Sequence, residues 1–313
     1  MTESSRSRPP ASGFESSFTW RTGGKEKGSR LDAAVSGYVK VSLEEAASLI
    51  DFGSVYVQGR VERNPAKVLA GDEEITVSFP PYGTRRFYEL DPARILFRDR
   101  FLLVYDKEAG IPSQQTPYDA YNNIYAALLR RLASEKVENP YAALHHRLDR
   151  ETSGVMLFAL DREVNRKLGQ AFQEKRAIKE YLAWAEGELE KDAWMSDREI
   201  GKIGGKYAAV GKGKGKKAET SFRVLYREPG RFLVLAQPLT GRTHQIRIHL
   251  SAEGHPVLGD RMYGAKPQKR LFLHALRLSI RHPARRSNLI VEAPVPPEWR
   301  LPPGLQFPPA QPA

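Results

Sequence analysis

The pattern of apolar and polar residues predicts two folded regions. The first covers residues 18–80 and the second covers residues 91–300. Serine, proline and arginine dominate residues 1–17, and proline dominates 301–313, so neither end has the periodicity of a helix or an inner strand. We therefore expect a disordered tail at 1–17 and a Pro-rich tail at 301–313.

Region 18–80 combines short helices with short strands. Ser42 precedes a helical spacing of apolar residues, and Glu45 completes the pattern of a capping box before Gly53 ends the helix. So small a module suits accessory binding better than catalysis. A first helical pattern opens at 30–32, a hairpin is predicted at 55–61, and a turn at 71–73 precedes a strand at 75–77.

Region 91–300 contains more strand-like than helix-like runs, and the two do not alternate regularly. Residues 155–160 form a continuous apolar run of strand length, and Asp161 then caps a predicted helix that extends to Lys175. This order predicts an α+β fold with a mixed, largely antiparallel central sheet flanked by helices. The other predicted strands are 95–97, 102–105, 181–185, 220–225, 232–236 and 276–280.

Charge and composition narrow the class of protein. Lys and Arg outnumber Asp and Glu by 49 to 37, a net charge of +12 that favours a polyanionic partner such as nucleic acid. No apolar run reaches the roughly 18–20 residues that a membrane span needs, so we expect no membrane partner. Cysteine is absent, which excludes disulfides, thiolate nucleophiles and cysteine-bound zinc and fits a reducing cytoplasm.

Residues 201–217 contain six lysines and no acidic residue. Their many glycines predict a flexible basic loop. It is no phosphate-binding P-loop, because the Gly-x-x-x-x-Gly-Lys-Ser/Thr pattern does not occur in it. A solvated insertion and a direct contact with phosphate both remain open.

Asp149 is the principal candidate for chemistry. It lies between Arg147 and Arg150, immediately before the apolar run, and neighbouring guanidinium groups keep a carboxylate ionised. A structural salt bridge is the alternative reading of the same residues. Several histidines are present, but none follows the His-Glu-x-x-His pattern, so no metal site is expected.

Several blocks in a fixed order resemble the RluA family of RNA pseudouridine synthases. The block around Asp149 reads His-Arg-Leu-Asp-Arg-x-Thr-Ser-Gly, and together the blocks span nearly all of 91–282. Glu108 and Leu160 depart from the family pattern, which usually has Pro and often has Lys at these positions. The blocks are 103–107 with 110–112, then 146–154, 179–183, 240–250 with 254–260, and 273–276.

The resemblance implies the pseudouridine synthase fold and a role for each of five residues. Asp149 would be the catalytic carboxylate, attacking either the sugar or the uracil ring. Arg147 would enter the RNA stack when the target uridine leaves it, and Arg247 would pair with Asp149. Tyr181 would stack on the uracil and take part in proton removal, with Leu273 lining the pocket behind it. No cofactor is needed, because nothing is oxidised and no group enters.

The local pattern around Arg247 predicts a helix. Thr243 would cap it, Ile246 and Leu250 would share one face, and Gly254 would end it. Alternating apolar residues also permit a strand in this segment.

Region 18–80 resembles the S-four-like RNA-binding domain, a small α/β module named after a ribosomal protein. The resemblance rests on residues 30–32, the Gly-x-Val-x-Val-x-Gly run at 53–59, and Leu-x-Gly-Asp at 69–72. The alternative is a small structural domain with solvated charges. The residues expected to face RNA are Arg30, Lys40, Gln58, Arg60 and, in the second region, Arg150.

The partner expected from both resemblances is RNA. Ribosomal RNA of the large subunit is favoured and transfer RNA is the alternative, and we expect a cytoplasmic monomer. Two other classes remain: an RNA-binding or ribosome-assembly protein without activity, and an RNA N-glycosylase that releases the base. The sequence does not specify the uridine, or whether Asp149 attacks the sugar or the base.

Overall fold

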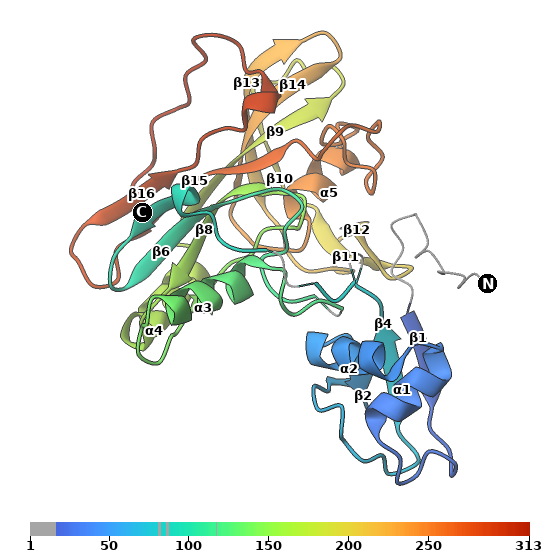
Figure 1. The fold of residues 1–313 in the computed structure, drawn as a ribbon. Coiled ribbons are helices and arrows are strands. Elements are labelled where there is room, and N and C mark those ends of the chain that lie inside the picture. The colour runs from blue at the N-terminus through green and yellow to red at the C-terminus, as the bar shows by residue number, and fades with distance from the viewer. Residues whose placement is uncertain (1–16, 81–82, 86–87, 117) are drawn as a thin grey trace, which may run out of the picture. The chain divides into compact units, whose positions relative to one another are not determined.

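The chain divides into two compact units. The computed structural model describes residues 17–313 except 81–82, 86–87 and 117. Unit 1 holds the residues up to Tyr88 together with Gln115–Asn122, and unit 2 holds Glu89–Gln114 and Asn123–Ala313 (Figure 1). Segment 115–122 belongs to unit 1, whereas the sequence analysis placed these residues in region 91–300.

Unit 1 contains a four-stranded antiparallel sheet and two helices. Ser42 accepts a hydrogen bond from the backbone N–H of Glu45 at 3.1 Å, and Gly53 ends the second helix with a φ of 83°, as predicted. Gln58 and Gly59 both have positive φ, as a two-residue type I′ hairpin turn requires. In sheet order the strands are β1 (Ser17–Arg21), β4 (Glu74–Ser78), β2 (Val55–Val57) and β3 (Arg60–Val61), and the helices are α1 (Leu31–Val39) and α2 (Leu43–Phe52).

Strand β1 was not predicted. The expected tail at 1–17 lies outside the described residues except for Ser17, which begins this strand. Trp20 of β1 is buried and stacks on Tyr38 with ring centroids 4.1 Å apart. Because β1 pairs with β4, more than fifty residues away, its short sequence carries little local signal of the pairing.

Segment 115–122 contacts the end of α2 and the residues just after it within unit 1. Ser54 donates a buried hydrogen bond to the Tyr118 carbonyl at 2.6 Å, and the Ala120 amide donates to the Phe52 carbonyl at 3.1 Å. The Phe52 and Tyr121 rings lie 5.0 Å apart. These contacts explain why the segment belongs to this unit despite its distance in sequence.

Unit 2 is built on a large mixed sheet. Only β8 and β15 pair in parallel; the other neighbours in this sheet are antiparallel, so the predicted fold class is confirmed. Every strand predicted in this region is present. In sheet order the strands are β10 (Ala193–Ser196), β13 (Thr220–Glu228), β14 (Arg231–Pro238), β9 (Ile178–Glu186), β15 (Leu273–Arg281), β8 (Ser153–Ala159), β6 (Leu102–Lys107) and β5 (Ile95–Arg98), with β16 (Asn288–Glu292) beside β15 and β7 (Ala143–Leu144) beside β8.

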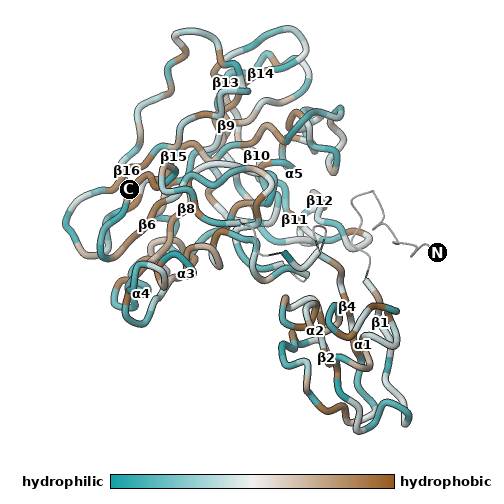
Figure 2. Tube along the Cα trace, in the orientation of Figure 1, coloured by the Kyte–Doolittle hydropathy of each residue, from teal (hydrophilic) through white to brown (hydrophobic). Residues whose placement is uncertain are grey.

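Helices cover the sheet at two places. Helix α4 (Arg162–Gln173) packs Val164, Leu168 and Ala171 against apolar residues of β6, β8 and β15. Asp161 caps α4 as predicted, accepting from the Glu163 amide at 2.8 Å, but the helix ends before Lys175. Helix α5 (Gln245–Ala252) packs against β9, β13 and β14. The central strands β6 and β8 carry much of the hydrophobic colour in Figure 2. Unit 2 also contains helix α3 (Ile124–Ser134).

Residues 201–217 are not the flexible loop that their composition predicted. Strands β11 (Glu199–Ile203) and β12 (Lys206–Val210) form an antiparallel hairpin, and Lys216 then exchanges two backbone hydrogen bonds with Ile200. The glycines serve close packing: a Cβ on Gly215 would lie 2.6 Å from a Val210 methyl group. Lys202 and Lys206 thus lie in the hairpin, and the other four lysines lie in the segment that follows it.

The C-terminal segment packs on unit 2. Residues 301–313 contain no helix or strand, as their prolines predicted. Leu305 and Phe307 nevertheless pack against the cluster around Trp299, and the Pro308 carbonyl accepts from Arg277 at 3.0 Å. Among the described residues, no helix is long and apolar enough to cross a bilayer.

Candidate active site

Asp149 lies in the loop between β7 and β8. Its side chain is 24% exposed, and the backbone around it is held by neighbours. Ser113 donates to the Leu148 carbonyl at 2.7 Å and accepts from the Leu148 amide at 3.0 Å. Gly154 follows with a φ of 111°, where a Cβ would lie 2.2 Å from the Ala275 carbonyl oxygen. The glycine of this motif therefore allows β8 and β15 to approach each other directly below the loop.

Lys107 secures the other side of the loop. Its side chain is fully buried at the end of β6, and its ammonium group donates to the carbonyls of Glu108, Ile111 and Arg150 at 2.7, 2.7 and 2.9 Å. Burial lowers the pKa of Lys107 to about 7. The sequence placed Lys107 in a family block without a role. Only the folded chain brings the three carbonyls together around it.

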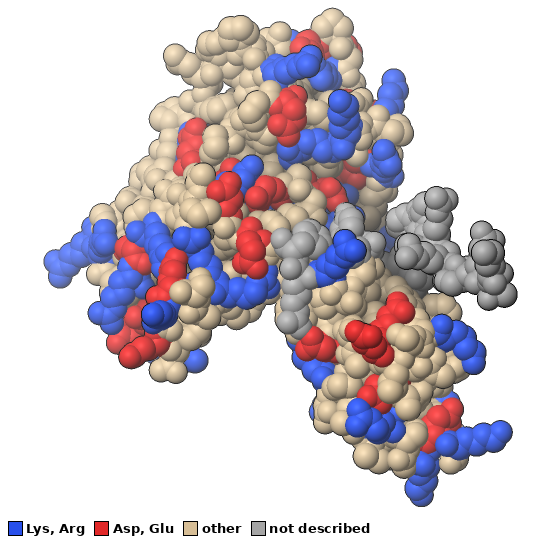
Figure 3. All heavy atoms as spheres, in the orientation of Figure 1, with Lys and Arg blue, Asp and Glu red and all other residues tan. Residues whose placement is uncertain are grey.

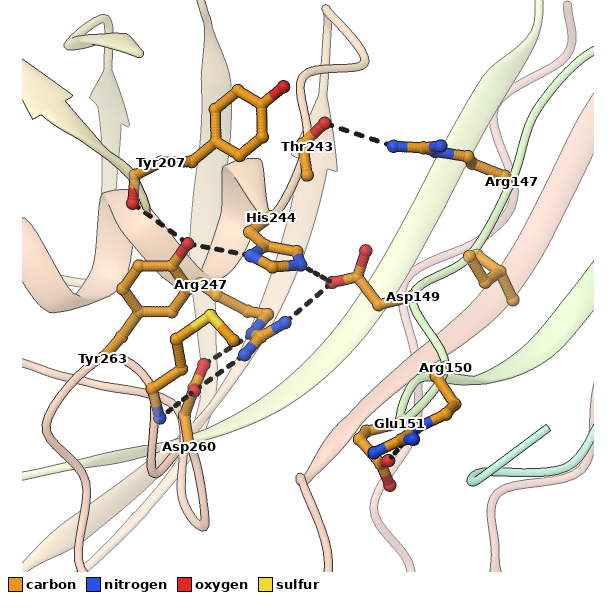
Figure 4. A network of polar contacts seen from close by, with 12 residues as sticks. Arg147, Asp149, Arg150, Glu151, Tyr207, Thr243, His244, Arg247, Asp260 and Tyr263 are labelled. Atoms are coloured by element: carbon orange, nitrogen blue, oxygen red, sulfur yellow. Dashed lines mark hydrogen bonds and ion pairs between the residues drawn. The ribbon is translucent and has the colours of Figure 1, made fainter. Parts of the chain in front are cut away.

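Arg247 joins two carboxylates at the centre of the site (Figure 4). Its Nη1 donates to Asp149 Oδ2 at 3.0 Å, while its Nε and Nη2 grip Asp260 at 2.6 and 2.8 Å. Burial opposes its charge, but the hydrogen bonds and charges of Asp260 and Asp149 outweigh burial and raise the pKa of Arg247. The predicted pair of Asp149 and Arg247 is present. Asp260 completes it, although the sequence assigned Asp260 no role.

Helix α5 carries Arg247, as predicted, but its N-terminus differs. The cap is His244, which has a left-handed backbone with φ 55° and makes no side-chain cap bond, so the prediction of Thr243 as the cap was wrong. The preceding turn is fixed by the Gln245 amide oxygen, which accepts from the Thr240 hydroxyl at 2.7 Å and from the Arg242 amide at 3.0 Å. Gly254, just beyond the helix, has a φ of 85° and ends it as expected.

Arg147, Tyr181 and Leu273 surround the same cavity as Asp149 and Arg247. Arg147 is exposed and donates to the Thr243 hydroxyl at 3.3 Å. Tyr181 stands on β9 and Leu273 begins the adjacent β15. Burial, together with the negative charge of Asp149, raises the pKa of Tyr181 far above its ordinary value. All five residues that the resemblance singled out thus meet at one place.

The cavity has a volume of about 460 Å³. That lies within the roughly 300–1,000 Å³ of small-molecule pockets and is ample for one nucleobase. Its wall also includes Phe172 of α4 and His244, neither of which the sequence marked for this site. Apolar and donor groups therefore line a space of suitable size in front of Asp149.

The residues predicted to bind RNA outside the cavity do not form a comparable network. Gln58 and Arg60 are exposed at the β2–β3 hairpin, and Lys40 ends α1 in a left-handed conformation. Arg30 pairs with Asp32 at 2.5 Å. In unit 2, Arg150 is exposed and pairs with Glu151 at 2.8 Å. No group of three or more potential metal-binding side chains occurs among the described residues.

Comparison with known proteins decides the family. A family model described as RNA pseudouridylate synthase matches residues 101–252. The ribosomal large subunit pseudouridine synthase C of Salmonella typhimurium strain LT2 is 31% identical over 86% of this chain and 90% of that protein. The chain belongs to the RNA pseudouridine synthase family. Asp149, Tyr181 and Arg247 of this synthase lie within the matched stretch, and Asp260 and Leu273 follow it.

Two further comparisons agree. The enzyme of the same name from Pasteurella multocida strain Pm70 is 34% identical, and the alignment spans 66% of this synthase and 66% of that protein. The structure titled Human RNA Pseudouridylate Synthase Domain Containing 4 has a TM-score of 0.55 and 26% identity, covering 65% of this chain and 89% of that one. The predicted pseudouridine synthase fold of unit 2 is thereby confirmed.

Proposed function

We propose that this synthase converts uridines of large-subunit ribosomal RNA to pseudouridine, with Asp149 as its catalytic carboxylate. The observation that carries the proposal is that Asp149, bonded to Arg247, lines a nucleobase-sized cavity. Relatives named as ribosomal large subunit synthases support the choice of RNA. A ribosomal substrate also fits the cytoplasmic location expected from the cysteine-free sequence. Transfer RNA is the alternative substrate.

The reaction is an isomerisation within one nucleotide. The bond between the sugar's carbon 1′ and nitrogen 1 of uracil breaks, the base turns, and carbon 1′ joins carbon 5. One proton leaves carbon 5 and nitrogen 1 gains one, so atoms and electrons balance without a cofactor. Asp149, which accepts a hydrogen bond from Arg247, is the nucleophile or anionic stabiliser for the cleaved state.

The other cavity residues serve the exposed uridine. A uridine must leave its stack before Asp149 can reach it, and exposed Arg147 stands where it could replace the base. Tyr181 offers its ring to stack on uracil, and Leu273 closes the apolar side beside it. Because its pKa is raised, Tyr181 keeps its proton at neutral pH, which suits stacking better than proton removal.

Unit 1 is proposed to be an S-four-like RNA-binding module. Its order of two helices and a small sheet agrees with that resemblance. Its proposed RNA contacts are Arg30, Lys40, Gln58 and Arg60.

Basic side chains also gather on unit 2 around α3 and α4, as Figure 3 shows. Among them are the exposed side chains of Arg162, Arg166 and Lys167 on α4. A polyanion would meet positive potential at such a surface.

The test is to incubate purified enzyme with total RNA and with unmodified large-subunit ribosomal RNA, and then to map pseudouridine. We expect new pseudouridine at a small number of ribosomal positions and no release of uracil. Modification confined to transfer RNA would overturn the proposed substrate. Free uracil would indicate a glycosylase, and the absence of pseudouridine on every RNA would contradict the activity.

A further inference from the structure

His244 occupies a special position in the cavity wall. It precedes α5 with a left-handed backbone, a conformation uncommon for residues other than glycine. Its side chain is 20% exposed and borders the cavity beside Asp149 and Arg247. The roles proposed so far leave this imidazole unused.

The protonation of the ring follows from its hydrogen bonds. The Tyr263 hydroxyl donates its single hydrogen to the Tyr207 carbonyl at 3.1 Å, so it can only accept from the His244 ring. The His244 Nδ1 lies 2.8 Å from that hydroxyl oxygen and must therefore carry a hydrogen. In the neutral ring the other nitrogen, Nε2, then carries no hydrogen and has a lone pair that can accept a proton. Figure 4 shows this chain from Tyr207 to His244.

The free nitrogen faces the candidate nucleophile. His244 Nε2 is 3.8 Å from Asp149 Oδ2, beyond ordinary hydrogen-bond length, and both groups border the cavity. Two acceptors at this separation cannot bond each other directly. A substrate hydrogen that approaches the Asp149 carboxylate would also lie close to a proton acceptor, His244 Nε2.

Burial lowers the pKa of His244 below its ordinary 6.5, which keeps the ring neutral at physiological pH. The charged groups that face the ring are Asp149 and Asp260, which favour protonation, and Arg247 and Arg147, which oppose it. Tyr181, the other candidate acceptor, has a raised pKa and is a poor base as its phenolate is inaccessible at neutral pH.

We propose that His244 is the general base that removes the proton from carbon 5 of the turned uracil. The inference rests on the proposed function and adds a catalytic residue to it. Once carbon 1′ has joined carbon 5, the carbon–hydrogen bond breaks, its electron pair restores the uracil ring, and the proton passes to Nε2. Nitrogen 1 regains a proton, so the imidazolium or solvent completes the exchange. Tyr263 positions the ring through Nδ1.

His244→Asn is the matched test. Asparagine tolerates a left-handed backbone, and its amide can still donate to the Tyr263 hydroxyl in place of Nδ1, while Nε2 is lost. On a large-subunit ribosomal RNA transcript we expect the single-turnover rate to fall by roughly 10²–10⁴-fold, the usual contribution of general base catalysis. RNA affinity should stay within about threefold, because a neutral cavity residue adds little phosphate contact.

Isotope and pH measurements separate a base from a structural residue. A transcript with deuterium at carbon 5 should react more slowly than its protium form with His244→Asn, since proton removal then limits the rate. With the wild type, the rate should fall as the pH drops through the pKa of His244, below 6.5, and His244→Asn should lose this dependence. Tyr263→Phe removes the hydroxyl that holds the imidazole of His244 but leaves the imidazole itself. Its rate should fall less than the rate of His244→Asn.

His255→Gln is the control, because His255 bonds the Glu186 carbonyl at 3.1 Å and does not border the cavity. Its rate should match the wild type within about twofold, as for a surface change away from the site. A wild-type rate in His244→Asn, or a loss without isotope effect or altered pH profile, would overturn the inference alone. Absence of wild-type activity on the transcript and on total RNA would instead overturn the proposed function, and the inference with it.

Discussion

Two buried arginines of unit 2 make nearly the same set of bonds, yet Arg247 lines the cavity that holds Asp149 and Arg277 does not. Arg247 and Arg277 are each 7% exposed, and each joins one buried carboxylate to one partly exposed carboxylate. For Arg247 these are Asp260 and Asp149; for Arg277 they are Glu180 and Glu292. An ion pair by itself therefore does not identify a catalytic residue.

The difference lies in how each guanidinium divides its donors. Arg247 gives two donors to buried Asp260 and one to Asp149, whose Oδ1 accepts no hydrogen bond from the described residues. Arg277 does the reverse, with two donors on the outer Glu292 and one on buried Glu180. Asp260 thus fixes the position of the Arg247 guanidinium. Arg247 in turn orients Asp149 through one carboxylate oxygen and leaves the other available for chemistry.

Asp149→Asn should have the largest effect. Asparagine keeps the shape but has no negative charge, so single-turnover pseudouridine formation should fall by at least about 10³-fold, as when a catalytic group is removed. RNA affinity, measured by filter binding, should change little because the phosphate contacts are elsewhere. Affinity lost in step with activity would mean that Asp149 is a binding or structural residue.

Arg277→Met should act on stability alone. It leaves Glu180 buried without a partner, which typically costs about 3–5 kcal/mol of unfolding free energy. Chemical denaturation measures this loss, while the rate per folded molecule should stay within about twofold because Arg277 does not border the cavity. Adding Glu180→Leu should restore much of the stability. A large loss of rate in the folded variant would erase the distinction between the two arginines.

Arg247→Lys should impair both properties moderately. A single ammonium cannot reach Asp149 while making two parallel bonds to Asp260. We expect a rate about 10–100-fold lower, with unfolding free energy lower by about 1–2 kcal/mol. Rapid-quench kinetics and denaturation on the same preparation would check the pair of values. Wild-type kinetics in Arg247→Lys would show that the orientation of Asp149 does not depend on the guanidinium group.

The smallest expected effect is a pH dependence at the structural arginine. Burial raises the pKa of Glu180 above its ordinary 4.5, against the effect of Arg277. A raised folded-state pKa contributes stability that is present below 4.5 and is lost as the pH rises through the folded value. Glu180→Gln should remove this decline from the unfolding free energy measured between pH 4 and 7. An unchanged profile would contradict the assignment.

The sequence predicted the centre of the site better than its support. Asp149, Tyr181, Arg247 and Leu273 were found because they lie in ordered motif blocks, and the fold brings all four to one cavity. Asp260 lay in one of the same blocks, but its partner could not be read from spacing alone. The three carbonyls around Lys107 and the free nitrogen of His244 likewise exist only once distant loops are packed together.

The fold was predicted where local signals suffice. The caps Ser42 and Asp161 and the apolar run of β8 behaved as their sequence indicated. Strand β1 was missed because its partner is far away in the chain, and the hairpin β11–β12 was missed because glycine and lysine conceal strand pairing. Gly215 illustrates this. It permits a close backbone contact, whereas composition alone predicted that a glycine at this position makes the chain flexible.

Asp149 is proposed here to be the residue that forms pseudouridine in large-subunit ribosomal RNA. The most direct measurement maps pseudouridine in that RNA from cells lacking the gene, complemented with either the wild type or Asp149→Asn at equal protein level. We expect defined uridines to lose the modification in the deletion strain, to regain it with the wild type and to stay unmodified with Asp149→Asn. Restoration by Asp149→Asn, or an unchanged pseudouridine map in the deletion strain, would contradict it.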